Sequence, residues 1–403
     1  MKAHSISGSD LLPVPGIRLA AIAAGIRYQG RNDLALIEIA QGSNVIAVFT
    51  RNRFCAAPVT IAKRHLSQTS PRFLVINSGN ANAGTGARGL EDAERCCHAL
   101  AHSQHLSAEL VLPFSTGVIG ERLPADKIVS VFPDLLGKLE ADRWGEVSEA
   151  IMTTDTVPKA LSRQVELQGG KITITGIAKG AGMIHPNMAT MLAYIATDAR
   201  LPDEWLQQWM PQLVGGSFNS ITVDGDTSTN DACVLIATGA SSLAPVSDDE
   251  KQRVFAALQA VFVGLAQGII RDAEGATKFV TVQVEEAMSY AEARRVADAV
   301  ALSPLVKTAL FASDPNWGRI LAAVGRAEVD DLDLSGVTLL MGDVVVVSGG
   351  EPAATYTEAE GQRVFEQPEI TLEIRLGRGR ERAVLWTSDL SHDYVSINAE
   401  YRS

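Results

Sequence analysis

One glycine-rich stretch, IAKGAGMIHPNMATML at residues 177–192, contains two side chains that could do chemistry. Lys179 is an ionisable group among apolar residues and glycines, and buried lysines often change their pKa and take functional roles. Thr190 carries a hydroxyl, but a threonine that opens an apolar strand is usually an ordinary β-branched strand residue. The stretch therefore indicates a nucleophile only if another segment supplies the rest of a site.

A candidate oxyanion hole follows a predicted strand, in the segment STGVIG at residues 115–120. The hydroxyl of Thr116 and the backbone N–H of Gly117 are adjacent there and can donate two hydrogen bonds to one oxygen. Such a pair stabilises the negative oxygen that forms when a nucleophile adds to a carbonyl group. The same segment is also typical of a simple turn in which a hydroxyl bonds to the nearby backbone.

A third segment, GTGARG at residues 84–89, matches the G-x-G-x-x-G pattern of dinucleotide-binding proteins and lies between a predicted strand and a predicted helix. Two features argue against a dinucleotide site. Several residues separate the strand from the first glycine, so the turn is not tight, and the next strand, which ends at Ser115, offers no acidic residue for a ribose. We interpret the segment as a glycine-rich loop that fixes backbone turns.

Two groups of residues resemble metal sites, and neither is complete. The first group lies on one predicted helix and contains Cys96, Cys97, His98, His102 and His105. It lacks the glutamate that a metalloprotease helix carries between its histidines, and no second cysteine–histidine group occurs elsewhere in the sequence. The second group contains Asp224, Asp226 and Asp231 and lacks the closing glutamate of a calcium loop. We predict no metal site, and a structural role for His185, which precedes Pro186 in a turn or extended segment.

Short apolar runs bounded by turn residues predict the strands that position these groups. The predicted strands are residues 73–76, 109–114, 171–177, 191–195, 233–237, 305–311, 337–341, 344–347, 370–376 and 383–386. The run 171–177 alternates strictly, which predicts a half-buried strand. Predicted helices cover residues 90–106 and 291–301, and two more begin at Ser247, with an S-x-x-E capping box, and at Asn316. Helices and strands mix without regular β–α–β alternation, which favours an α+β fold.

Length and composition limit the class of protein. The 403 residues suggest two or three domains, with the expected boundary near residue 285. The 35 basic and 47 acidic residues give a net charge of −12, which argues against nucleic acid and anionic membrane surfaces as partners. Four cysteines without a CxxC pair favour a reducing compartment. The N-terminus lacks the apolar core of a signal peptide, and the most apolar helical stretch, residues 255–270, is too short to span a bilayer. We therefore expect a soluble, cytoplasmic protein.

Nine segments, spread over almost the whole chain, resemble one family of enzymes. They are AAPVT (56–60), VINSGNANAGTG (75–86), STGVIGERLP (115–124), MTTDTVPK (152–159), GIAKGAGMIHPNMATMLAYIATDA (176–199), SFNSITVDGDTSTND (217–231), RDAEGATKF (271–279), SDPNWGRI (313–320) and DYVSINAEYRS (393–403). On these segments the chain resembles the ornithine acetyltransferases, the often bifunctional glutamate N-acetyltransferases of arginine biosynthesis. Several of the segments are long and rare, so chance does not explain the similarity.

The resemblance implies a layered helix/sheet/sheet/helix core around an N-terminal-nucleophile-like site, with a smaller C-terminal α+β domain. It also implies self-cleavage between Ala189 and Thr190. The expected parts are then residues 1–189 as an α chain, residues 190–285 as the part of the β chain that completes the core, and residues 286–403 as its C-terminal domain. The processed chains are expected to form an α2β2 heterotetramer.

The matching motif positions also imply the residues of the site. Thr190 would be the nucleophile, and its new α-amino group, with a reference pKa of about 8, could take the proton of its own hydroxyl. Thr116 and Gly117 would form the oxyanion hole. The residues that would line the substrate site are Thr153, Lys179, Thr190, Glu274, Asn398 and Ser403.

Two of these residues have charges that suit an amino-acid substrate. From the sign of the charge alone, we expect Glu274 to contact a substrate ammonium group and Lys179 a substrate carboxylate. Ser403 stands where members of the family often end in threonine, so the hydroxyl is kept and a methyl contact is lost. Without the resemblance, Glu274 is typical of a surface carboxylate and Lys179 of a snorkelling side chain.

The implied reaction is a ping-pong transfer of the acetyl group of N-acetylornithine to glutamate through an acetyl-threonine intermediate. It requires no cofactor, and the sequence leaves open whether acetyl-CoA is a second acetyl donor. Two alternatives also stay open at this point. One is a related self-processed aminopeptidase or amidase, which passes the acyl group to water. The other is a non-enzymatic binding protein that keeps the fold.

Overall fold

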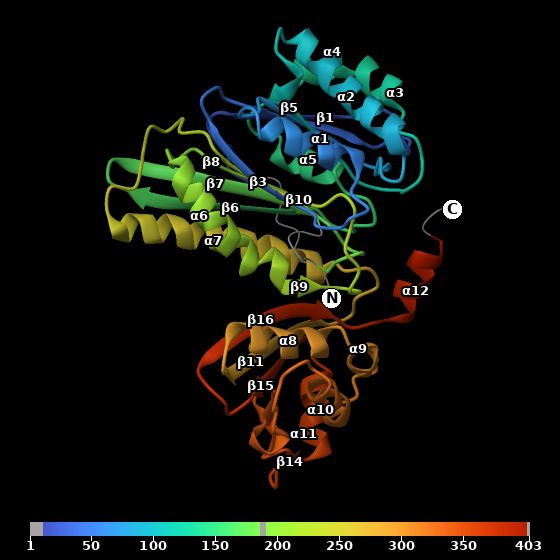
Figure 1. Ribbon diagram of the computed structural model, residues 1–403, viewed down its shortest axis with the longest axis vertical. Helices are drawn as coiled ribbons and strands as arrows, with labels where there is room; N and C mark the ends of the chain where they lie inside the picture. Colours follow the sequence, from blue (N-terminus) through green and yellow to red (C-terminus); the bar gives the residue numbers. More distant parts are fainter. Residues whose placement is uncertain (1–10, 186–190, 401–403) are drawn as a thin grey trace. The chain divides into compact units, whose positions relative to one another are not determined.

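The computed structural model describes residues 11–185 and 191–400, which form two compact units (Figure 1). The larger unit consists of the described part of His4–Asn219 together with Asp226–Ile269. The smaller unit consists of Ser220–Gly225 and the described part of Ile270–Ser403. The main segment of the smaller unit thus begins at Ile270 instead of near residue 285, because strand β11 (Phe279–Ala287) lies in the interior of its sheet.

Two sheets form the centre of the larger unit. In the four-stranded sheet, the strands lie in the order β1 (Ile17–Ile22), β2 (Leu34–Ile39), β4 (Phe73–Asn77) and β5 (Val111–Ser115). In the five-stranded sheet, the order is β3 (Asn44–Phe49), β10 (Ala232–Ala237), β8 (Leu192–Thr197), β7 (Gly170–Lys179) and β6 (Lys159–Leu167). β4 and β5 are parallel, as are β8 and β10, whereas the other neighbouring strands are antiparallel.

The two sheets pack against each other, and apolar side chains from both form one buried cluster. Leu19 and Phe114 come from the four-stranded sheet, and Tyr194 and Val234 from the five-stranded sheet. The ring centroids of Phe114 and Tyr194 lie 5.3 Å apart in an edge-to-face contact. This cluster also takes in Trp144 of α5 (Trp144–Ala150).

Helices cover the outer face of each sheet. A second buried cluster joins the four-stranded sheet to the helices α1 (Ala57–Leu66), α2 (Gly86–Ser103), α3 (Ala125–Ser130) and α4 (Phe132–Gly137). The helices α6 (Asp203–Gly215) and α7 (Asp248–Arg271) lie along the five-stranded sheet (Figure 1). The larger unit therefore has the predicted helix/sheet/sheet/helix layers, and the α+β fold class is confirmed.

The expectation that residues 171–177 form a half-buried strand is wrong. β7 is buried on both faces from Ile172 onward, because the second sheet lies on one side and α7 on the other. A Cβ atom added to Gly176 would lie 3.0 Å from Leu265 and 3.1 Å from Val261, both on α7. The alternation of apolar and polar residues therefore did not indicate solvent on one face, because the alternating polar residues Thr173 and Thr175 are themselves buried.

Helix α7 begins where the capping signal at Ser247 predicted it. Its first turn is capped by Ser247, whose Oγ accepts a hydrogen bond from the Glu250 N–H at 3.2 Å. The Glu250 carboxylate accepts from the N–H groups of Val246 and Gln168 instead of closing a capping box on Ser247. With 24 residues the helix is long and apolar enough to cross a bilayer by length and composition, contrary to expectation. However, side chains such as Phe262 on one side of it are fully buried within the unit.

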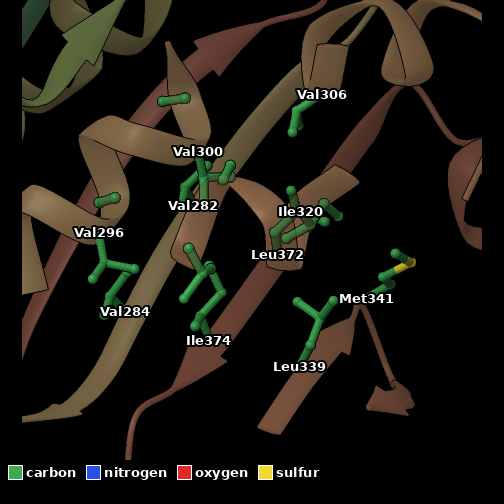
Figure 2. Packing of buried hydrophobic residues seen from close by; sticks show 14 of the residues in the cluster. Val282, Val284, Val296, Val300, Val306, Ile320, Leu339, Met341, Leu372 and Ile374 are labelled. Atoms are coloured by element: carbon green, nitrogen blue, oxygen red, sulfur yellow. The ribbon is translucent and has the colours of Figure 1, made fainter. Parts of the chain in front are cut away.

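A seven-stranded sheet forms the centre of the smaller unit. Its strands lie in the order β14 (Glu351–Pro352), β13 (Val344–Ser348), β12 (Thr338–Met341), β15 (Glu369–Arg375), β11, β16 (Glu381–Ser388) and β9 (Ile221–Thr222). The helices of this unit are α8 (Tyr290–Ala301), α9 (Pro304–Phe311), α10 (Trp317–Gly325), α11 (Glu358–Phe365) and α12 (His392–Ala399). Figure 2 shows its core, where Val282, Val284 and Ile374 of the sheet lie beside Val296 and Val300 of α8.

One predicted strand, residues 305–311, is wrong, because this segment is helix α9. Ser303 accepts a hydrogen bond from the Val306 N–H, and Pro304 occupies the first helical position, where its missing N–H costs nothing. Most of the other predicted strands and helices are confirmed to within a few residues. The helix predicted from Asn316, for example, is α10, with the Asn316 side chain as its N-cap.

Candidate active site

The residues implied by the resemblance fall into three groups in the structure. Ala189, Thr190 and Ser403 lie outside the described residues. Thr116, Gly117, Thr153 and Lys179 belong to the larger unit. Glu274 and Asn398 belong to the smaller unit.

Lys179 joins the candidate residues of the larger unit. It is the last residue of β7, it is only 8% exposed, and β8, the strand that follows Thr190 in the sequence, pairs with it at Leu192. Its Nζ donates hydrogen bonds to Thr153 Oγ1 at 2.9 Å and to Thr116 Oγ1 at 3.2 Å. Three residues from distant parts of the sequence are thereby brought together around one ammonium group.

Two asparagines hold the backbone that carries Thr116, Asn77 through its backbone carbonyl and Asn230 through its side chain. The Thr116 N–H donates to the Asn77 carbonyl oxygen at 3.0 Å, which continues the pairing of β4 with β5. The Asn230 amide donates to the Ser115 carbonyl oxygen at 2.9 Å and to the Ala81 carbonyl oxygen at 2.6 Å. The sequence analysis missed Asn77 and Asn230 as supporting residues, although both lie within the conspicuous segments 75–86 and 217–231.

Gly117 has a backbone conformation that other residues rarely adopt, with φ at +132°. A Cβ atom at this position would lie 2.2 Å from the backbone carbonyl carbon of Gly79. Within the described part of the chain, the Gly117 N–H donates no hydrogen bond. The Gly117 N–H and the Thr116 hydroxyl are therefore two adjacent donors, as an oxyanion hole requires.

A buried carboxylate, Asp155, stabilises the charge of Lys179, and the sequence analysis missed it. Its Oδ1 accepts from Lys159 Nζ at 2.5 Å and from the Gly180 N–H at 2.7 Å. Its Oδ2 accepts from the Thr153 N–H at 3.0 Å and lies 3.7 Å from Lys179 Nζ. Burial alone would raise the pKa of this carboxyl, but the two ammonium groups outweigh burial and hold that pKa well below its usual value.

A second buried carboxyl group, Asp231, lies beside the start of β8. The residue after it, Ala232, donates its N–H to the Met191 carbonyl oxygen at 2.9 Å. Asp231 is 3% exposed, and burial raises its pKa well above the ordinary value, against the opposing effect of nearby groups that include Ser228 and Lys179. A buried carboxyl group with a raised pKa therefore lies next to the strand that follows Thr190 in the sequence.

In the smaller unit, Glu274 and Asn398 contact each other. The Asn398 amide donates to Glu274 Oε2 at 2.7 Å and to the Tyr394 carbonyl oxygen at 2.9 Å. Asn398 lies on α12, whose first turn is capped by Ser391. Glu274 is 9% exposed, so it is not the surface carboxylate that its position in the sequence suggests without the resemblance.

The segments that resemble a dinucleotide site or a metal site do not have the geometry of such sites in the described residues. In the G-x-G-x-x-G segment, β4 ends at Asn77 and α2 begins only at Gly86, so no tight strand-to-helix turn exists. Over residues 11–185 and 191–400, no group of three or more histidine, cysteine or acidic residues could hold a metal ion. Cys96 and Cys97 lie on the buried face of α2, whereas His98 is exposed.

The four cysteines are expected to differ sharply in reactivity. Burial raises the pKa of Cys96 to about 12 and raises the pKa of Cys97 and Cys233 well above the ordinary value, whereas Cys55 is partly exposed. A thiol-specific chromogenic reagent should therefore modify one thiol per native chain quickly and all four in denaturant. Rapid modification of two or more thiols in the native protein would contradict the described packing.

Comparisons with known proteins support the family that the nine sequence segments indicated. The sequence model of the ArgJ family matches residues 18–403. The arginine biosynthesis bifunctional protein ArgJ of Methylococcus capsulatus is 55% identical over 403 residues, which cover 99% of this chain and 98% of that protein. The protein of the same name from Pseudomonas fluorescens is 53% identical over 396 residues, which cover 98% of each chain.

A solved structure supports the same assignment. The crystal structure of the arginine biosynthesis bifunctional protein argJ from Bacillus halodurans is 36% identical and matches with a TM-score of 0.50. The match covers 53% of this chain and 100% of that chain. A family match over nearly the whole length, with relatives above half identity, settles the family. The resemblance seen in the nine segments is therefore confirmed, and the chain belongs to the ArgJ family.

Proposed function

We propose that the chain is a glutamate N-acetyltransferase, which transfers the acetyl group of N-acetylornithine to glutamate in arginine biosynthesis. Membership of the ArgJ family supports the pathway. The single observation that carries the chemistry is the meeting of Thr116, Thr153 and Lys179 around one ammonium group. These residues come from three separate segments, and a catalytic role is a direct reason for them to converge.

The first half of the reaction would acetylate Thr190. Its α-amino group takes the hydroxyl proton, and the hydroxyl oxygen adds to the acetyl carbonyl of N-acetylornithine. The carbonyl oxygen becomes negative and accepts hydrogen bonds from the Thr116 hydroxyl and the Gly117 N–H. The C–N bond then breaks, the amine takes the proton, and ornithine leaves.

The second half would reverse these steps with glutamate as the acceptor. The amine of glutamate adds to the ester carbonyl of acetyl-Thr190, and the same two donors stabilise the oxyanion. The threonine oxygen leaves and regains its proton, which gives N-acetylglutamate and the free enzyme. Glu274, buried and held by Asn398, is the proposed partner of a substrate ammonium group.

The contacts of Lys179 support a role different from the carboxylate contact that its charge suggested. Its ammonium group contacts two hydroxyls and the Asp155 carboxylate within the larger unit. We therefore propose that Lys179 orients the Thr116 hydroxyl and stabilises the developing oxyanion. A substrate carboxylate is left to the other residues that the resemblance places in the site.

The nucleophile would be made by self-cleavage between Ala189 and Thr190. The Thr190 hydroxyl attacks the Ala189 carbonyl, and the N→O acyl shift breaks the C–N bond, which gives an ester and a free α-amino group. Water then hydrolyses the ester to free the Thr190 hydroxyl and the Ala189 carboxylate. The products would be chains of residues 1–189 and 190–403, which we propose to assemble as an α2β2 heterotetramer in the cytoplasm. We also propose acetyl-CoA as a second acetyl donor, because the relatives carry the name bifunctional.

One assay separates this function from that of a self-processed amidase. Release of ornithine from N-acetylornithine is measured with and without glutamate, together with formation of N-acetylglutamate. The transferase requires release to depend on glutamate and the two products to form in equal amounts. Equal ornithine release with and without glutamate would favour transfer of the acetyl group to water and overturn the proposal. Acetyl-CoA with glutamate, in place of N-acetylornithine, tests the second donor.

A further inference from the structure

A cluster of buried charged side chains lies behind the Thr116 hydroxyl. We call it the Asp155 cluster, and its members are Thr153, Asp155, Lys159, Lys179 and Gly180. Asp155, Lys159 and Lys179 are each at most 8% exposed as whole residues. Of these residues, only Thr153 and Lys179 entered the site through the resemblance. The role of Asp155 and Lys159 therefore remains to be explained.

We propose that Asp155 is a positioning residue of the oxyanion hole. Its carboxylate holds the ammonium group of Lys179 charged and directed at Thr116, so that the Thr116 hydroxyl donates its proton to the substrate oxygen. The inference deepens the proposed function and rests on it. It adds a residue that touches neither the substrate nor the reacting atoms and acts through Lys179 alone.

The hydrogen bond between Lys179 and Thr116 has a defined direction. An ammonium group has donors and no acceptor, so the bond of 3.2 Å between Lys179 Nζ and Thr116 Oγ1 runs from lysine to threonine. The hydroxyl oxygen of Thr116 thus accepts one bond, and its single proton is left for another acceptor. A neutral lysine could accept that proton instead, which would turn the hydroxyl away from the oxyanion.

The Asp155 carboxylate opposes loss of that proton from Lys179. It lies 2.5 Å from Lys159 Nζ and 3.7 Å from Lys179 Nζ, so its negative charge is close to two buried ammonium groups. Removal of the carboxylate would leave both ammonium groups in a setting that disfavours charge. The carboxylate is itself fixed by the N–H groups of Thr153 and Gly180, one of which immediately follows Lys179.

Among the described residues, the carboxyl group of Asp231 also acts on Lys179. Asp231 is close enough for its charge to interact with the ammonium group, but burial raises the pKa of Asp231 whereas the lysines lower the pKa of Asp155. Asp155 is therefore the carboxylate that stays ionised over the wider range of pH. Thr116 and Thr153, which also contact Lys179, have no charge to contribute.

The test is the isosteric variant Asp155→Asn, with kcat and KM measured from pH 6 to 9. We expect kcat at neutral pH to fall by about 10²- to 10³-fold, as for loss of an oxyanion-hole donor, with little change in KM. The ratio of wild-type to variant kcat should narrow as the pH falls, by up to about tenfold per pH unit, because acid restores the proton of Lys179. If the variant is purified uncut, its rate of self-cleavage is measured over the same pH range instead of kcat. Self-cleavage also passes through an oxyanion.

Two further variants separate this role from simple loss of stability. Lys159→Gln in the Asp155→Asn background removes the second ammonium group and should restore at least about tenfold of the lost kcat. Asp198→Asn is the matched control, because Asp198 is also buried beside the five-stranded sheet, where it accepts from the Thr173 N–H at 2.7 Å. It should leave kcat and its pH dependence unchanged.

Three results would each overturn the inference. They are a kcat for Asp155→Asn within about threefold of wild type, a kcat ratio that does not change with pH, and a double variant no faster than Asp155→Asn. The wild-type enzyme is assayed first with N-acetylornithine and glutamate. Absence of transfer there overturns the proposed function, whereas normal transfer with an unaffected Asp155→Asn variant overturns only the role of Asp155.

Discussion

Thr190→Ala is expected to yield one uncut chain of 403 residues with no acetyl transfer above background. Alanine has no hydroxyl to attack the Ala189 carbonyl, so neither the two chains nor the α-amino base can form. The loss should be complete, because cleavage and catalysis use the same oxygen. A denaturing gel with intact-mass measurement, followed by the glutamate-dependent assay, checks both effects.

Thr190→Ser is the matched control for this variant. It keeps a hydroxyl and loses one methyl group, so it should still cleave and keep measurable transfer activity. Self-cleavage of the alanine variant would show that another group attacks the peptide bond, and the proposed mechanism would be wrong.

Gly117→Ala is expected to lower acetyl transfer by more than the loss of one oxyanion donor, which costs about 10²- to 10³-fold. The added Cβ would lie 2.2 Å from the Gly79 backbone carbon and 2.5 Å from the Asn80 backbone nitrogen, so the 115–120 segment must shift. Its φ of +132° also disfavours any side chain. Both effects move the Gly117 N–H away from the site.

The neighbouring Gly120→Ala separates local strain from displacement of the donor. Gly120 also has a positive φ, of +86°, but a Cβ atom there would meet nothing within 4 Å. This variant should lose about 1 kcal/mol of stability and keep most of its kcat. Comparison of thermal midpoints and kcat for the two variants makes the test, and an equal loss of kcat in both would contradict the role of the Gly117 N–H.

Local signals predicted most of the elements, and they failed where two signals competed. Asn316 marked the start of α10 correctly, because a side-chain cap is a local feature of the sequence. Residues 305–311 have the composition of a strand, yet Ser303 and Pro304 just before them begin a helix. The strand was predicted from the short apolar run alone, and the helix-start signal of Ser303 and Pro304 was overlooked. The burial of β7 depends on α7, far away in the sequence, and could not be predicted from β7 alone.

Only those residues of the candidate site that lie in recognisable motifs could be predicted from the sequence. Thr116 and Lys179 were singled out separately by their type and neighbours, and the structure shows that they meet. Asp155 escaped notice because Lys179 comes from a different strand, and because its four-residue spacing from Lys159 falls where β6 begins and not on a helix. The one available signal was its place in the rare segment MTTDTVPK, at residues 152–159. Asn398 and Glu274 are 124 residues apart, and only the fold brings them into contact.

The central claim is that Thr190, once it is a chain terminus, carries the acetyl group. The most direct test is the intact mass of the purified protein before and after incubation with N-acetylornithine in the absence of glutamate. We predict two chains, with one acetyl group added to the 190–403 chain, located on Thr190 by fragmentation and removed when glutamate is added. An active protein that remains a single unbroken chain, or an acetyl group found on residues 1–189, would contradict the mechanism.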